Sequence, residues 1–398
     1  MHSLKYLILG LSGIFVLFAG FGSAAELKPR IVCYYGSWSN AMKDIPVEKC
    51  THIYYSFLLL NETTWRYRFA GDEISERRKM AEFLNLRQNS TDAKFLLAIG
   101  GAAEGSAKYS NLAEFKERRT IFIESVVELL TEFKFDGVDV DWEFPGVFWE
   151  GAGQLGGGRP IDKRNLALFV EELRKAFDQL ERPLEITMAV GVLESFITAG
   201  YDVPRLCSTL DAVHVMTYAL RGSWDGVAEI HSLMYPRPTD VGEYRRYNTE
   251  GGSLLFSEYG CPKHKLIVGV AFFGHSFVLW NELNNKPGDL IDQEATIHLP
   301  GGGYMTYSEI CQTINEGNWT RVFDAVVQGP YATKGDLWVG YDDVESIGVK
   351  IDWLKNHSFG GAMTWAIEED DHKGLCGPKS PLITTMYDRL KDYVVVAP

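Results

Sequence analysis

The sequence lacks several features that would place it in common classes of protein. Lysine and arginine number 39 against 53 acidic residues, which gives a net charge of −14. Nucleic acids and anionic membranes attract basic surfaces, so we expect neither as a partner. The six cysteines form no CxxC pair, so we predict no metal site, and no motif indicates a cofactor. Repeats with a solenoid period are also absent.

Long apolar runs are scarce, and the one that is present lies at the N-terminus. Lys5 gives a basic start, an apolar run extends from Tyr6 to about Phe21, and small residues precede Glu26. This pattern predicts a secretory signal peptide over residues 1–25. A membrane anchor is the alternative, but the run is short and ends in a cleavage-like site. We therefore expect a secreted, extracellular protein with no membrane segment in its mature chain, residues 26–398.

Cysteines and glycosylation sequons fit that location. An even number of cysteines in a secreted chain favours disulfide pairing. Sequons also arise by chance, so they only support the signal peptide. They occur at Asn61, Asn89, Asn318 and Asn356.

Short runs of β-branched and aromatic residues alternate with amphipathic stretches. The clearest helical periodicity covers residues 112–133 and 165–180. Eight strands that alternate with helices pair in parallel and close into a barrel, which predicts an α/β fold of the (β/α)₈ TIM type. An open doubly wound sheet is the alternative, but no GxGxxG follows the first strand. The predicted strands are residues 30–36, 51–59, 94–100, 137–143, 184–190, 212–218, 266–274 and 361–367.

The last two predicted strands are far apart in the sequence. A connection within a βα unit has about 2–6 residues, whereas residues 274 and 361 are separated by a much longer stretch. That stretch contains a glycine run, several tyrosines and Trp319. We predict a small α+β insertion at about residues 276–338, which builds one wall of a cleft.

The segment FDGVDVDWEFPG, residues 135–146, carries acids at alternate positions. Side chains of a strand alternate between faces, so Asp139, Asp141 and Glu143 share one face and the apolar residues between them share the other. The apolar face suits the helix layer, which leaves the three carboxylates pointing into the barrel. Glu143 is then at the C-terminal end of the strand, where barrel enzymes have their active sites.

Buried carboxylates that lie close together raise one another's pKa, so one of them can stay protonated near neutral pH. A protonated Glu143 at the mouth of a barrel would be a general acid for a glycosidic oxygen. A metal-binding acid cluster and a purely structural cluster are the alternatives. Perturbed carboxylates at a strand end favour catalysis.

The segment resembles the DxxDxDxE signature of family 18 glycoside hydrolases, the chitinases and chitinase-like lectins, with Asp136, Asp139, Asp141 and Glu143 at its acidic positions. The resemblance extends over almost the whole mature chain. Its further segments are CYYGSW at 33–38, LLAIGG at 96–101, MTYALRGSWDG at 216–226, GVAFFGHSF at 269–277 and GGAMTWAIEEDD at 360–371.

The resemblance implies a retaining, substrate-assisted mechanism. Glu143 would protonate the leaving oxygen while the acetamide carbonyl of the substrate attacks the anomeric carbon. Asp141 would orient the acetamide N–H, and Asp139 would share a proton with Asp141. Tyr218 would hydrogen-bond the acetamide, and Asp136 would support the motif structurally. The implied substrate-binding residues are Trp365, as the floor under the sugar, with Tyr34, Trp38, Phe144, Met216 and Trp224.

Several positions depart from the family pattern. Ala102 and Ala103 replace a Trp-Asn pair, Ala219 replaces an aspartate, His275 replaces an arginine and Phe144 replaces a common tyrosine. Each lost contact could cost about 1–3 kcal/mol of transition-state binding. A weakly active or non-catalytic chitin-binding protein is therefore one alternative to a chitinase. An endo-acting enzyme on the chitobiose cores of N-glycans is another.

The resemblance also bears on disulfides and partners. It implies the bridges Cys33–Cys50 and Cys311–Cys376, and the pair that remains is Cys207–Cys261. The expected partner is chitin or chito-oligosaccharides, and we expect a monomer.

Overall fold

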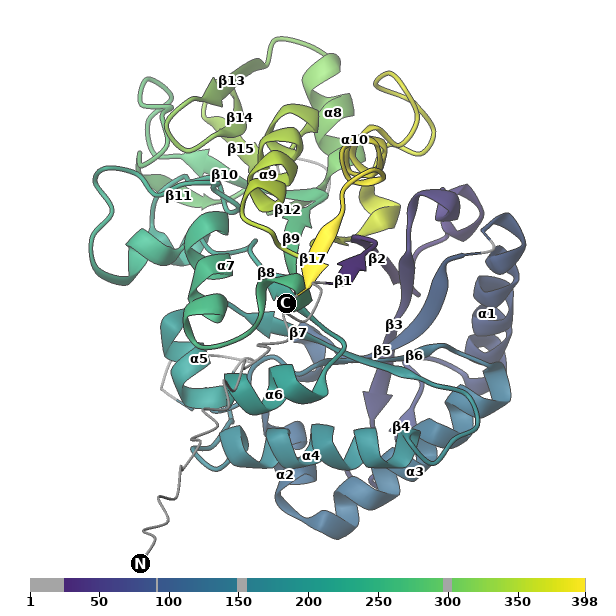
Figure 1. Ribbon diagram of the computed structural model, residues 1–398. Coiled ribbons are helices and arrows are strands. Elements are labelled where there is room, and N and C mark those ends of the chain that lie inside the picture. The colour runs from purple at the N-terminus through teal and green to yellow at the C-terminus, as the bar shows by residue number, and fades with distance from the viewer. Residues whose placement is uncertain (1–24, 91, 149–155, 296–302, 398) are drawn as a thin grey trace, which may run out of the picture.

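Eight parallel strands close into a barrel in the computed structural model, which describes residues 25–90, 92–148, 156–295 and 303–397 (Figure 1). Strand β2 pairs with β3 on one side and with β16 on the other, which closes the ring. The predicted (β/α)₈ barrel is confirmed. Its strands are β2 (Arg30–Gly36), β3 (His52–Leu60), β5 (Lys94–Gly100), β6 (Gly137–Asp141), β7 (Glu185–Gly191), β8 (Ala212–Met216), β9 (Leu266–Ala271) and β16 (Gly361–Trp365).

Four barrel strands end earlier than their sequence pattern predicted. The predicted strands 137–143, 212–218, 266–274 and 361–367 end at Asp141, Met216, Ala271 and Trp365. At the rim the chain turns away from its neighbours and loses its ladder of hydrogen bonds. Beyond Asp141 and Met216 buried and half-buried residues still alternate, and beyond Ala271 and Trp365 the next residues are still buried, so the pattern alone does not reveal the end.

Helices surround the barrel in Figure 1. The predicted helix 112–133 is wrong in one respect, because it is two helices separated by Phe115, whose backbone is extended (φ −107°, ψ 129°). The guanidinium of Arg119 donates to the carbonyl of Ala113 at 2.7 Å, which satisfies the free end of the first helix. The helices are α1 (Glu73–Asn85), α2 (Ala107–Glu114), α3 (Lys116–Phe133), α4 (Asp162–Phe177), α5 (Glu194–Gly200), α6 (Val203–Thr209), α7 (Thr249–Glu258), α8 (Tyr307–Asn315), α9 (Val344–Asn356) and α10 (Pro381–Leu390).

A second sheet lies between the seventh and eighth barrel strands in the sequence, in the region of the predicted insertion. It is antiparallel, and Figure 1 shows it beside the barrel, next to α8 and α9. Its two faces are covered by separate apolar clusters around Trp338 and Tyr341. Its strands are β10 (Phe273–Leu279), β11 (Ile291–Glu294), β12 (Tyr304–Thr306), β13 (Thr320–Asp324), β14 (Gly329–Lys334) and β15 (Leu337–Tyr341).

Two cores hold the barrel. The larger one fills the space between the strands and the helices, and the smaller one fills the barrel interior. Strand side chains are therefore buried on both faces, which explains why the sequence of these strands is apolar nearly throughout. The interior cluster consists of Val32, Tyr34, Tyr54, Leu96, Ala98, Ala212, Ile267 and Met363.

Three disulfides join neighbouring segments, and all three expected pairs are present: Cys33–Cys50, Cys207–Cys261 and Cys311–Cys376. The last one joins α8 of the second sheet to the segment after β16. It thus holds the inserted sheet against the eighth barrel unit.

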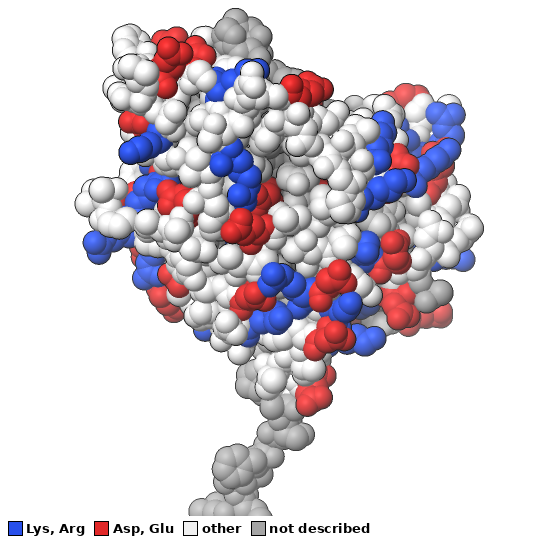
Figure 2. Space-filling view, turned by 90° about the horizontal axis from the view of Figure 1, so that it is seen from above, with Lys and Arg blue, Asp and Glu red and all other residues white. Residues whose placement is uncertain are grey.

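The two ends of the described chain meet in a small ladder, where β1 (Ala25–Leu27) pairs with β17 (Val395–Ala397). The predicted signal peptide lies almost entirely outside the described residues. Within the described part of the chain, every helix is too short or too polar to cross a bilayer. On the face seen in Figure 2, basic side chains lie among acidic ones and do not gather into a patch of one sign.

Candidate active site

Strand β6 divides its side chains between the two cores, as the alternation predicted. Val138, Val140 and Trp142 pack in the cluster between strands and helices. Asp139 is fully buried and contacts side chains of the barrel interior. Asp141 is the last residue of the strand and is 3 % exposed, and Glu143 follows it half-buried at the rim. The acids therefore run from the barrel interior to its C-terminal end.

Asp139 is held by neutral partners. The hydroxyl of Tyr34 donates to one carboxylate oxygen at 2.7 Å, and the hydroxyl of Thr187 donates to the other at 2.6 Å. His214 lies 3.4 Å away, and burial lowers its pKa well below the usual value, so it is uncharged. Burial raises the pKa of Asp139 to about 6, and the two hydroxyl hydrogen bonds lower it by less.

Asp141 and Glu143, the next two acids, also have no cationic partner in the part of the chain that the structure describes. Burial raises the pKa of Asp141 well above its usual value, and the carboxylates of Glu143 and Asp139 raise it further. One oxygen of Asp141 is buried without a hydrogen-bond partner among the described residues. Burial raises the pKa of Glu143 to about 7, against a smaller lowering by the backbone amide of Ala102. Glu143 can therefore hold a proton at neutral pH.

The loop after β5 positions that amide. The N–H of Gly101 donates to the carbonyl of Asp141 at 2.8 Å. Gly101 has φ +87°, and a Cβ there would lie 2.6 Å from the ring of Phe57. Only glycine avoids both the strain and the clash, so the Gly-Gly pair after the third barrel strand fixes Ala102 beside Glu143.

Aromatic rings gather beside the acids at the C-terminal end of the barrel. Trp365 is half-buried and stacks on Phe57, with centroids 5.5 Å apart and planes at 16°. Trp38 is 61 % exposed and lies 6.2 Å from Trp365. Sequence reasoning identified both tryptophans but missed Phe57. The available signal was an aromatic residue near the C-terminal end of the second predicted strand.

Tyr218 and Met216 also reach the site. The hydroxyl of Tyr218 has a weak partner, the sulfur of Met363 at 3.6 Å, and is therefore available to a stronger acceptor or donor. Burial raises the pKa of Tyr218 well above its usual value, and the carboxylates of Asp141 and Glu143 raise it further. Met216 is half-buried between the barrel interior and the ring of Phe144.

Two residues predicted to bind substrate are buried. Tyr34 is 1 % exposed, and its hydroxyl is used by Asp139 and by His214. Tyr34 therefore lies below the row of acids, where its hydroxyl donates a hydrogen bond to the buried carboxylate of Asp139. Phe144 is 8 % exposed and packs on Phe196 at 4.8 Å. The ring of Phe144 therefore packs in an apolar cluster with Phe196.

Two of the positions that depart from the family pattern, Ala219 and His275, lie beside the same aromatic stack. Trp224 is 66 % exposed, and its ring meets His275 edge-on at 6.2 Å. The ring of His275 stacks on His231 at 4.5 Å, and His231 stacks on Phe273 at 4.6 Å. The amide of Ala219 donates to the Nδ1 of His231 at 3.0 Å. An aromatic stack therefore stands beside Ala219.

Asp136 lies at the other end of β6. Its carboxylate pairs with Arg87 at 2.8 Å and with Arg182 at 2.7 Å, and it accepts a hydrogen bond from the amide of Phe95. These contacts join β5 to β6 below the barrel. They support the expectation that Asp136 has a structural role.

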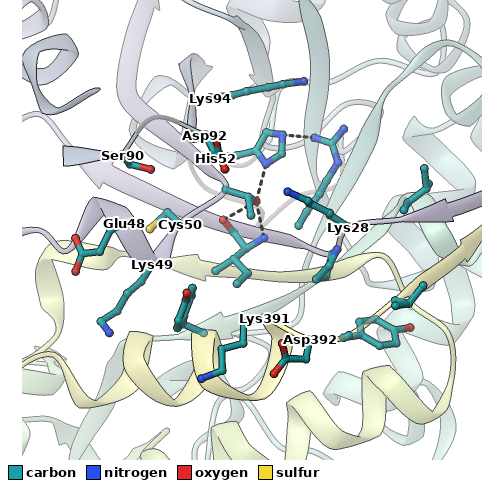
Figure 3. Close-up of a pocket in the computed structure, with 18 of the residues that line it drawn as sticks. Lys28, Glu48, Lys49, Cys50, His52, Ser90, Asp92, Lys94, Lys391 and Asp392 are labelled. Atoms are coloured by element: carbon teal, nitrogen blue, oxygen red, sulfur yellow. Dashed lines mark hydrogen bonds between the residues drawn. The ribbon is translucent and has the colours of Figure 1, made fainter. Parts of the chain in front are cut away.

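A cavity of about 1070 Å³ opens at that same N-terminal end of the barrel (Figure 3). Arg30 donates to His52 at 2.9 Å and to Glu185 at 2.7 Å, and Lys94 also pairs with Glu185. Burial alone would raise the pKa of Glu185, but His52 and Arg30 outweigh it and lower the pKa well below the usual range. This cavity is separate from the acid row.

One group of residues has the spacing of a metal site. Asp371 lies near the sulfurs of Cys311 and Cys376, but these two cysteines form a disulfide. Metals bind cysteine as a thiolate, so the group is no metal centre in this state.

A parallel barrel with a row of acids at the C-terminal end of its fourth strand, whose described partners are uncharged, is the arrangement expected of a barrel that hydrolyses glycosidic bonds. The chain belongs to the glycosyl hydrolases of family 18, whose sequence model matches residues 30–370.

Known relatives agree with this assignment. An endochitinase of Manduca sexta is 40 % identical over 391 residues, which cover 94 % of this chain and 70 % of that protein. The crystal structure of a Group IV chitinase of Ostrinia furnacalis with allosamidin is similar at a TM-score of 0.83 and 32 % identity, covering 91 % of this chain and 98 % of that one. Human YKL-39, described as a pseudo-chitinase that retains chitooligosaccharide binding, matches at 0.81 and 28 %, over 91 % and 99 %.

Proposed function

We propose that this chain is a secreted chitinase that hydrolyses β-1,4-linked N-acetylglucosamine polymers with retention of configuration. The observation that carries the proposal is the row of acids with no cationic partner among the described residues, which ends at Glu143 with a pKa of about 7. A glycosidic oxygen is a poor leaving group and needs a proton donor of this kind. An endo mode of attack and the signal peptide over residues 1–25 belong to the same proposal.

The reaction follows from the order of the acids. Glu143 gives its proton to the glycosidic oxygen, and the C–O bond to the aglycone breaks. The acetamide carbonyl of the substrate attacks the anomeric carbon and forms an oxazolinium ion. Asp141 passes its proton to Asp139, accepts a hydrogen bond from the acetamide N–H and offsets the positive charge. The hydroxyl of Tyr218 hydrogen-bonds the acetamide. Water then attacks the anomeric carbon, which opens the oxazolinium ring, and the proton released from this water returns to Glu143.

Three tryptophan rings supply the surface on which the sugar is proposed to bind. The exposed faces of Trp38 and Trp224 and the half-buried indole of Trp365 offer apolar planes at the rim. Sugar rings stack on such planes through their C–H groups. Chitin or a chito-oligosaccharide is the partner that fits both these planes and the acetamide chemistry of Asp141.

A protein that binds chitin without turnover is the second candidate. Its support is specific: Ala102, Ala103, Ala219 and His275 stand where the family pattern has Trp, Asn, Asp and Arg, so side chains that could contact a sugar are missing. At position 275 the histidine ring stacks on His231. Human YKL-39 is an example of a related fold with that behaviour.

One assay separates the two candidates. Hydrolysis of fluorogenic chitobiose and chitotriose is measured for the wild type and for Glu143→Gln. We expect the variant to lose at least about 10³-fold in kcat, because it cannot donate the proton. Equal, negligible rates for both proteins would reject the enzyme, and retention on chitin beads would then support the binding protein.

A further inference from the structure

Ser106 lies beside the turn that carries Glu143. It is fully buried at the start of α2, and its hydroxyl donates to the main-chain carbonyl of Phe144 at 2.6 Å. The same hydroxyl oxygen lies 2.7 Å from the indole Nε1 of Trp142. An indole N–H can only donate, so the hydroxyl accepts from it. One hydroxyl therefore joins the two residues on either side of Glu143, and the direction of both hydrogen bonds is fixed.

The place of Ser106 in the sequence offers its hydroxyl a different use. Ser106 is the N-cap residue of α2, where a serine side chain usually accepts a hydrogen bond from an amide of the first helical turn. In the described structure its hydroxyl caps no amide of this helix. The hydroxyl bonds instead to the residues that flank Glu143, so the turn after β6 gains two contacts that the helix end forgoes.

The segment before Ser106 is held firmly. The buried carboxylate of Glu104 accepts from Lys108 at 2.6 Å and from Arg68 at 3.0 Å with one oxygen. Its other oxygen accepts from the amide of Leu60, the last residue of β3, at 2.9 Å. These contacts join the loop after β5 to β3 and to α2. Ser106 therefore approaches the end of β6 from a fixed support.

Contacts from this loop surround Glu143 in the sequence. The amide of Gly101 donates to the carbonyl of Asp141, and the serine hydroxyl binds the indole of Trp142 and the carbonyl of Phe144. Both partners of the hydroxyl belong to buried residues, so its removal leaves a buried donor and a buried acceptor unpaired. That loss costs free energy unless the turn moves, and a turn that moves takes the carboxyl of Glu143 with it.

We propose that Ser106 is a positioning residue for the catalytic acid, whose hydroxyl holds Trp142 and Phe144 so that the carboxyl of Glu143 points at the glycosidic oxygen. A proton donor must lie within hydrogen-bond reach of that oxygen, and a displacement of about 1 Å can lower the rate about 10²-fold. The kinetic consequence rests on the proposed function. The environment of Glu143 in the ligand-free protein is independent of any activity.

The kinetic test compares Ser106→Ala with Ser106→Cys in the full chain. Alanine lacks the hydroxyl, and cysteine has nearly the size of serine but is only a weak donor and acceptor. For hydrolysis of fluorogenic chitotriose, we expect kcat of Ser106→Ala to fall about 10- to 100-fold. KM stays within about twofold, because the tryptophan rings that bind the sugar are unchanged. Ser106→Cys lies between the wild type and Ser106→Ala.

The pH–rate profile adds a readout that a purely structural role would not move. Burial is the main cause of the raised pKa of Glu143. A displaced turn lets water reach the carboxyl, which lowers that pKa. In Ser106→Ala we therefore expect the activity to be lost at a lower pH than in the wild type, as pH rises.

A matched control removes the same pair of hydrogen bonds elsewhere. Ser125 is also fully buried, and its hydroxyl donates to the carbonyl of Phe122 at 2.8 Å and accepts from the amide of Tyr67 at 3.2 Å. It lies in α3, in the helix layer. We expect Ser125→Ala to keep kcat within about twofold of the wild type and to keep its pH–rate profile.

A measurement without substrate separates this proposal from the proposed function. A ¹³C carboxyl titration of ligand-free, glutamate-labelled protein gives the pKa of Glu143, and we expect a lower value in Ser106→Ala than in Ser125→Ala. An unchanged titration in Ser106→Ala, or equal kcat values for Ser106→Ala and Ser125→Ala, overturns the proposal. Ser106→Cys takes the place of Ser106→Ala in both comparisons if the alanine variant fails to fold. A wild type without hydrolysis contradicts the proposed function, and the ligand-free titration still decides the role of Ser106.

Discussion

The two ends of the barrel surround their carboxylates with different groups. At the N-terminal end, Glu185 lies among Arg30, His52 and Lys94, and its pKa is lowered. At the C-terminal end, Asp141 and Glu143 lie beside each other, and their pKa values are raised. Both ends bury acids in the same sheet, so the neighbours determine the difference. Cations make an acid a permanent charge that holds strands together, and acids without cations hold exchangeable protons.

The largest effect on stability is expected at the N-terminal end. Glu185→Gln leaves the nearly buried guanidinium of Arg30 without its carboxylate, so we expect a loss of about 3–5 kcal/mol in the free energy of unfolding. Because the pKa of Glu185 is lowered by folding, its contribution is present at pH 7 and is lost as pH falls below about 4. Urea unfolding at pH 7 and at about pH 2.5, below the usual pKa of a glutamate, measures it. A loss below about 1 kcal/mol at pH 7, or a changed pH–rate profile, would contradict the comparison.

The next effect concerns activity at the C-terminal end. Asp141→Asn removes the acid that faces the acetamide and that becomes charged opposite the oxazolinium ion once its proton has moved to Asp139, so we expect kcat to fall about 10²–10³-fold. The same change removes a buried acid whose pKa is raised, so the folded protein does not become less stable. Steady-state kinetics and thermal unfolding of the same sample check both statements. An activity within about tenfold of the wild type would show that Asp141 has no such role.

A smaller effect is expected from a single hydroxyl. Tyr218→Phe removes the donor to the acetamide, and we expect kcat/KM to fall about tenfold. Tyr393→Phe is the control, because its hydroxyl also makes one hydrogen bond, to the carbonyl of Phe359 at 3.0 Å, but near the C-terminus. Equal kcat/KM values for the two variants would remove Tyr218 from the mechanism.

The sequence pattern was sufficient for the barrel and for the acid row. Alternation placed Asp139 and Asp141 in the interior, because period-two patterns follow directly from strand geometry. The alternation did not reveal that the strand ends before Glu143, because residues that follow the strand at the rim continue to alternate between apolar and acidic. The break at Phe115 was missed as well, because it depends on Arg119, a residue of the next helix, reaching back to Ala113.

Parts of the site that arise from distant segments were not predictable. Tyr304 comes from the inserted sheet and meets Glu369 only through the tertiary fold. Tyr34 was expected at the surface of the site, and its burial became evident only with its partners Asp139 and His214. No local pattern in the sequence records which loop packs against which.

The pKa of Glu143 tests the account most directly. A ¹³C carboxyl titration of glutamate-labelled protein, with Glu143→Gln to assign the signal, gives this value. We predict a pKa of about 7 and an activity that falls as pH rises through it, because the proton donor is lost. The same raised pKa means that the free energy of unfolding falls as pH rises from about 4.5 to about 7 through this group. A pKa near that of an ordinary glutamate, about 4.3, would contradict the central claim.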